Sequence, residues 1–155
     1  LPDALARTLA SLVPAAIEGV LRDLTIASPF GAPELEAIAD HAGCGLVEAA
    51  DRREALLAAL QRAREDNVFV IAAGRAPEAG FADEIAELIG AGRRIARMRE
   101  RPESFLTRLL PALSPPAALL APREKFVAIA ASDILSMSRR LGAAPALRRR
   151  AQQVD

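Results

Sequence analysis

The sequence predicts an α/β fold of three layers, with helices on both faces of a mostly parallel sheet. The first observation is residues 68–71, Val-Phe-Val-Ile, a run of bulky β-forming residues without a polar face. Such a run is typical of a strand that is buried on both sides, as parallel strands are. The second observation is that helix-like and strand-like patterns alternate from residue 3 to residue 90. This alternation is typical of βαβ units, and we expect residues 1–155 to form a single domain.

Local signals define the elements of the first half. Asp3 and Asp51 are plausible N-caps, and Pro33 stands at a first helical position, ahead of acidic residues that suit the helix dipole. Pro14 is expected to stop the first helix and Gly43 the second. The expected helices are 3–13, 33–43, 51–65 and 81–89, and the expected strands are 20–27, 45–49 and 67–72.

The pattern is less regular after residue 90, and residues 93–101 fit either a helix or an edge strand. Farther along, we expect a helix over 104–113 broken at Pro111, a strand over 117–121, helix over 122–141 in up to two pieces, and a terminal helix over 144–155.

The functional site is expected at residues 72–78, because ligands of such sheets bind at the carboxyl ends of the strands. This stretch reads Ala-Ala-Gly-Arg-Ala-Pro-Glu, with no carboxylate before Glu78 and no histidine or cysteine. Arg75 could bind a diphosphate directly, because a guanidinium suits phosphate recognition. The competing interpretation is a solvated loop arginine.

Composition limits the function classes. The formal net charge is zero and the chain has no Trp or Tyr, so neither charge nor stacking favours a nucleic-acid partner. The single cysteine, Cys44, cannot form an internal disulfide, which favours a reducing, cytoplasmic location. No apolar run is long enough to predict a transmembrane segment or a signal peptide. Oligomeric state cannot be read from these features.

Four stretches resemble the family-2 glycosyltransferases of the GT-A, Rossmann-like fold. They are residues 5–14 with 18–27, residues 35–44 with 46–49, residues 59–65 with 68–71 and 77–81, and, more weakly, residues 120–123 with 133 and 138–142. The resemblance covers most of the chain. It implies a nucleotide-sugar ligand, a divalent metal, and Asp133 as the general base that deprotonates an acceptor. It also implies a further strand ahead of residue 5, so the N-terminal strand is expected to be missing here.

The departures from this family fall on its chemistry. The acid that grips the donor nucleotide is replaced by Ala27-Ser28-Pro29-Phe30, where Ser28 is the remaining polar candidate for nucleotide binding. The paired acids that hold Mg²⁺ or Mn²⁺ are replaced by Ala72-Ala73-Gly74-Arg75, so no metal ligand is predicted. Asp133 has a competing interpretation as a helix-capping residue.

Three functional hypotheses follow. The first is a glycosyltransferase-like domain that transfers a sugar weakly or not at all by itself, with Asp133 as base and Arg75 in place of the metal. The second is a non-catalytic binding or scaffold module on the same fold. The third is a small all-α interaction protein, since Ala, Leu, Arg and Glu dominate the composition.

Overall fold

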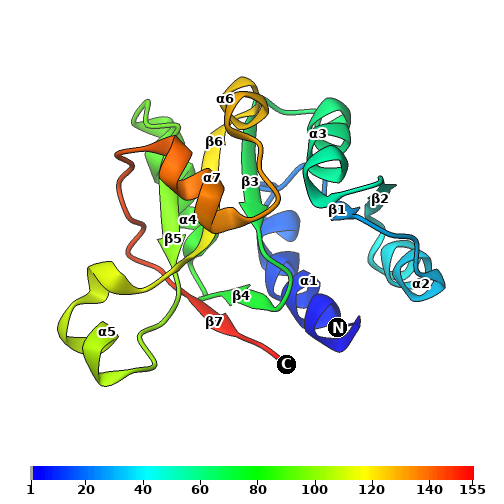
Figure 1. The fold of residues 1–155 in the computed structure, drawn as a ribbon. Helices are drawn as coiled ribbons and strands as arrows, with labels where there is room; N and C mark the ends of the chain where they lie inside the picture. Colours follow the sequence, from blue (N-terminus) through cyan, green and yellow to red (C-terminus); the bar gives the residue numbers. More distant parts are fainter. Residues whose placement is uncertain (1) are drawn as a thin grey trace.

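The computed structural model describes residues 2–155, which form a mixed arrangement of helices and strands (Figure 1). The helices are α1 Pro2–Ile17, α2 Pro33–Ala42, α3 Arg52–Arg62, α4 Phe81–Gly90, α5 Phe105–Leu109, the 3₁₀ helix η1 Pro111–Leu113, α6 Arg123–Ile129 and α7 Ile134–Leu141. The strands are β1 Thr25–Ser28, β2 Gly45–Glu48, β3 Asn67–Ile71, β4 Arg75–Pro77, β5 Ala96–Arg99, β6 Pro116–Pro122 and β7 Ala151–Gln153. These strands exclude the all-α alternative.

Most of the local signals of the first half form the expected elements, but Asp3 lies in the first turn of α1 and is not its N-cap. Asp51 accepts a hydrogen bond from the Glu54 amide and caps α3, while Gly43 ends α2 at φ 63°, a conformation that glycine adopts without strain. The first helix is longer than predicted, because α1 continues through Pro14 to Ile17. Pro14 lies on the exposed side of α1, where water can satisfy the carbonyl that proline leaves without a partner.

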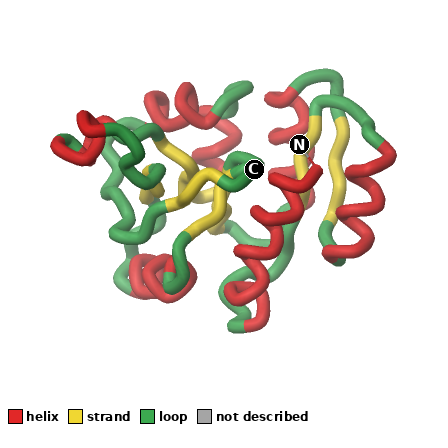
Figure 2. The backbone as a smooth tube through the Cα atoms, turned by 90° about the horizontal axis from the view of Figure 1, so that it is seen from below, coloured by secondary structure: helices red, strands yellow, loops and turns green. Residues whose placement is uncertain are grey.

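The prediction of a mostly parallel sheet is wrong. The strands form three small sheets, in the orders β1-β2, β3-β6-β5 and β4-β7, and only the β1-β2 pair is parallel. Figure 2 shows β1 and β2 apart from the other strands. The segment 93–101 resolves as a strand, β5, which pairs with β6.

Strand β3, which was predicted to be buried on both sides, lies at the edge of its sheet. Strand β6 takes the central place, and its residues 117–121 are at most 2% exposed. All five residues of β3 are half-buried, because β3 pairs with β6 on one side and with no strand among residues 2–155 on the other. The outer edge of β1 is likewise unpaired within this range, and β1 and β3 do not pair with each other.

Helices cover both faces of the three-stranded sheet. Phe69 and Ile71 of β3 point into a core cluster with α1 and α4, whereas Val68 and Val70 point into a second cluster with α3, α6 and α7. A third, smaller cluster packs α1 and α2 against β1 and β2. Helix α1 therefore contributes to the cores on both the β1-β2 side and the β3-β6-β5 side.

The predicted terminal helix over 144–155 is wrong. This segment is extended and ends in β7, which pairs with β4 inside the region 73–80 that was expected to be only a loop. Its backbone groups are satisfied by partners distant in the chain. The Arg97 amide donates to the Pro145 carbonyl, and the Leu147 amide donates to the Arg97 carbonyl. The Glu78 amide donates to the Arg150 carbonyl. These bonds replace those that a helix would supply. Within residues 2–155, no helix is long and apolar enough to cross a membrane.

Candidate functional site

The turn after β3, where the site was expected, is tightly enclosed. Gly74 has φ 82°, and its amide donates to the Thr8 hydroxyl of α1 at 3.0 Å. Its carbonyl accepts from the Val154 amide, also at 3.0 Å. A Cβ added to Gly74 would lie 3.6 Å from the Val154 carbonyl oxygen and 3.8 Å from the Ala4 Cβ. The turn is thus held between α1 and the C-terminal segment.

Arg75 is already engaged in an ion pair. Its Nε lies 2.5 Å from the Glu100 carboxylate, its Nη1 donates to the Gly74 carbonyl, and the two paired side chains are 25% and 21% exposed. The solvated-loop interpretation of Arg75 therefore does not describe it. Its charge is matched by Glu100, which weakens the attraction that this guanidinium exerts on an anion.

The neighbouring acids hold the C-terminal segment. The Glu78 carboxylate accepts from the Arg150 amide at 3.2 Å and pairs with Arg101 Nε at 3.2 Å. The Glu84 carboxylate accepts from the amides of Arg148 and Arg149. The sequence interpretation did not identify the contacts with the amides of residues 148–150, because these amides lie more than 60 residues away from Glu78 and Glu84 along the chain.

Ser28 is the last residue of β1, one residue beyond the predicted end of this strand at residue 27. Its hydroxyl donates to the Phe30 carbonyl at 2.9 Å, and the residue is 9% exposed. This bond stabilises the turn after β1. The single proton of the hydroxyl is therefore used within the fold, and its oxygen keeps lone pairs that can accept a hydrogen bond.

Asp133 is the N-cap of α7. One carboxylate oxygen accepts from the Ser136 amide and the other from the Ser136 hydroxyl, both at 2.7 Å. These bonds hold the pKa of Asp133 below its ordinary value. A carboxylate with a lowered pKa is a weaker base, so this geometry favours the capping interpretation.

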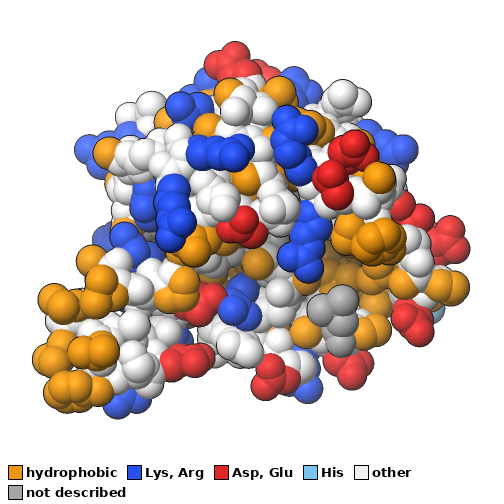
Figure 3. Space-filling view, in the orientation of Figure 1, with side chains coloured by type: hydrophobic (Ala, Val, Ile, Leu, Met, Phe, Trp, Pro, Cys, Tyr) orange, Lys and Arg blue, Asp and Glu red, His pale blue; other side chains and the backbone are white. Residues whose placement is uncertain are grey.

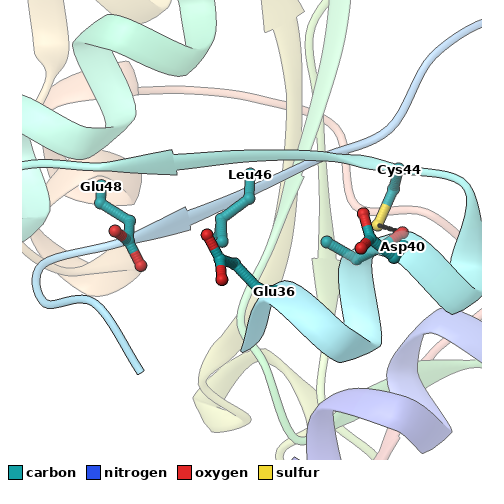
Figure 4. Close-up of a pocket in the computed structure, with 6 residues that line it drawn as sticks. Glu36, Asp40, Cys44, Leu46 and Glu48 are labelled. Carbon is teal, nitrogen blue, oxygen red and sulfur yellow. Dashed lines mark hydrogen bonds between the residues drawn. The ribbon is translucent and has the colours of Figure 1, made fainter. Parts of the chain in front are cut away.

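No hydrogen bond or ion pair between described residues joins Ser28, Arg75 and Asp133. None of the three lines either of two surface cavities near α2. One cavity, of about 280 Å³, lies between α2 and β2 and gathers the carboxylates of Glu36, Asp40 and Glu48 (Figure 4). The other, of about 530 Å³, is a more apolar groove between α1 and α2.

Cys44 lies beside the carboxylates of the first cavity, and its thiol donates to the Ala39 carbonyl at 3.7 Å (Figure 4). Burial raises the pKa of this thiol, so it is a poor nucleophile.

The metal that the sequence resemblance implies does not fit the turn after β3. Residues 72–77 supply no carboxylate, and Glu78 is used by Arg150 and Arg101. Across residues 2–155, no group of three or more His, Cys, Asp or Glu side chains is placed to hold a metal ion. No catalytic step can therefore be derived through a metal at this turn.

Comparisons with known proteins relate the fold to a glycosyltransferase. No protein-family model and no curated protein matches the sequence. A solved structure, glucosyl-3-phosphoglycerate synthase from Mycobacterium tuberculosis in complex with phosphoglyceric acid, superposes with a TM-score of 0.65 at 17% identity. The match covers 92% of this chain and 64% of that one. It supports a glycosyltransferase-like fold, but the narrower assignment to family 2 is not supported.

Proposed function

We propose that this chain is a glycosyltransferase-like domain of the nucleotide-sugar class that has little or no metal-stimulated transfer activity by itself. The observation that carries the proposal is the turn after β3. It lacks carboxylates from residue 72 to residue 77, and its one charged side chain, Arg75, is paired with Glu100. The fold supports the class, and this turn supports the loss of activity.

Sugar transfer from a nucleotide diphosphate needs a grip on the nucleotide, neutralisation of the diphosphate and a base for the acceptor. The candidates on this chain are Ser28, Arg75 and Asp133, and each already has a partner within the fold. Removing one preorganised charge-stabilising group commonly costs about 10² to 10³ in rate. Two independent losses would leave activity lower by on the order of 10⁴ to 10⁶.

The test measures donor hydrolysis and sugar transfer with uridine and guanosine diphosphate sugars, with and without Mn²⁺. We expect no metal-stimulated turnover above the rate without protein. Asp133→Asn is the matched variant, because asparagine also caps helices and should keep α7 folded. Robust Mn²⁺-stimulated turnover that disappears in Asp133→Asn would overturn the proposal.

Diphosphate binding is tested separately by calorimetry with uridine diphosphate. We expect weak binding that Arg75→Gln reduces further, because the guanidinium is the cation at the turn. Arg101→Gln is the control, since Arg101 is a more exposed arginine, 60% exposed, that pairs with Glu78 nearby. Equal effects of the two variants would remove Arg75 from the proposed site.

A binding module on the same fold is a second candidate function. It is favoured by a surface feature outside the candidate site, the exposed apolar side chains on α5 and η1.

A further inference from the structure

The segment 104–113, here called the apolar hairpin, exposes large hydrophobic side chains to solvent. It contains α5 and η1 and connects β5 to β6. The exposed side chains are Phe105 at 74%, Leu106 at 65%, Leu109 at 62%, Leu110 at 57% and Leu113 at 60%. Figure 3 shows hydrophobic side chains gathered on the outward side of this projecting lobe, at the lower left. A contiguous patch of this kind marks an interaction site.

The hairpin is held in place by specific bonds. Ser104 and Thr107 form a reciprocal capping box at the start of α5. Arg99 of β5 donates from Nη1 to the carbonyls of Ala112 and Ser114, at 2.6 and 2.9 Å. The fold therefore fixes this segment while leaving its leucines outside the three core clusters, none of which includes them.

The charge of the hairpin suits a second copy of the same chain. The hairpin, residues 104–113, carries one charged residue, Arg108, and Glu103 directly before it balances that charge. The whole chain has a formal net charge of zero, so two copies approach without overall repulsion. The segment lacks the excess of Lys and Arg that favours docking on an anionic membrane.

The area of the patch is sufficient for a small dimer. A large apolar side chain exposes on the order of 150–200 Å² when fully accessible, so the five exposed fractions leave roughly 500–600 Å². Two such patches packed together bury roughly 1,000–1,200 Å², which reaches the lower end of specific protein interfaces. Most of that area is apolar, like the core of homodimer interfaces.

We propose that the chain forms a two-fold symmetric homodimer through the apolar hairpin. In such an interface the same patch serves both copies, so the leucines of one hairpin cover those of the other. The Glu103 and Arg108 charges are opposite in sign and available at the rim. This proposal stands on the hairpin alone and does not depend on the proposed function.

The test measures molar mass by size-exclusion chromatography with light scattering over a wide range of protein concentration. We expect the unmodified chain to shift from monomer to dimer as concentration rises. Leu106→Glu with Leu109→Glu should raise the dimer dissociation constant at least tenfold, because buried carboxylates without partners oppose association. Leu135→Glu is the control, since Leu135 is an exposed leucine of α7, 44% exposed, outside the hairpin.

Circular dichroism checks that the variants keep their fold, and Phe105→Ser gives a milder second variant that should also weaken the dimer. A monomer at every concentration overturns the proposal. A dimer that the hairpin variants leave unchanged overturns it as well. Sedimentation of the monomer with phosphatidylcholine and phosphatidylglycerol vesicles, lost in the double variant, would assign the patch to a membrane surface instead.

Discussion

Glu84 is the residue whose replacement tests the tertiary fold most directly. Its carboxylate is 9% exposed and accepts hydrogen bonds from the Arg148 and Arg149 amides, at 2.6 and 2.9 Å. These bonds attach the C-terminal segment to α4. Because a single carboxylate serves two backbone donors, changing it affects a segment more than 60 residues away along the chain.

We expect Glu84→Gln to lower the free energy of unfolding by about 2–4 kcal/mol. Hydrogen bonds to a charged group contribute about 1.5–3 kcal/mol each, against about 0.5–1.5 kcal/mol for neutral ones, and a glutamine has one acceptor oxygen for two donors. For a chain of this size the loss corresponds to a fall of about 5–15 °C in Tm.

The assay is urea unfolding followed by circular dichroism, with hydrogen exchange read at the Arg148 and Arg149 amides. Glu87→Gln is the matched control, because Glu87 lies on the same helix and contacts Arg148 with a side chain that is 71% exposed. Exposed pairs of this kind contribute about 0–1 kcal/mol. Equal unfolding midpoints for the two variants, with unchanged protection of both amides, would refute the assigned role of Glu84.

Three further predictions concern separate elements. Because Ser136 holds the pKa of Asp133 below its ordinary value, the charged cap stabilises the fold fully above about pH 4, and this contribution is lost as pH falls through the lowered pKa. The difference in urea midpoint between the unmodified chain and Asp133→Asn should therefore shrink in acid, and a constant difference would contradict the capping role. Cys44 should be alkylated at pH 8 more slowly than a cysteine in a short peptide, because burial raises its pKa; equal rates would show an accessible thiolate. Alternate amides of β3 should exchange faster than those of β6, since β3 pairs on one side only; uniform protection would indicate a partner for the free edge of β3.

The sequence by itself determined most of the local elements. The apolar run at 68–71 is a strand, and the caps at Asp51 and Gly43 mark helix ends where they were expected. These features depend on neighbours within one or two turns of chain, so they are visible in a linear pattern. The helices and strands predicted from residue 3 to residue 90 are found, but β1 begins at Thr25 and not at residue 20, and β4 at Arg75–Pro77 was not predicted.

The candidate site was determined by the sequence only in part. The sequence showed that residues 72–77 lack the acids of a metal site and that Arg75, Ser28 and Asp133 are the remaining polar candidates. It did not show that each of them is already bonded within the fold, to Glu100, to the Phe30 carbonyl and to Ser136. The Asp133 cap lies within reach of a sequence pattern, whereas the Arg75–Glu100 pair joins β4 to the residue that follows β5, 25 positions along the chain.

Only the tertiary structure decided the order and direction of the strands. Periodicity reports which faces of a strand are buried but not which strand lies beside it, so it could not place β6 between β3 and β5. The same limit explains the C-terminal segment. Residues 144–155 suit a helix by composition, but the carboxylates of Glu84 and Glu78 and the edge of β4 satisfy their backbone groups in an extended form. Long-range hydrogen bonds of this kind outweigh helix propensity, which amounts to less than about 1 kcal/mol per residue.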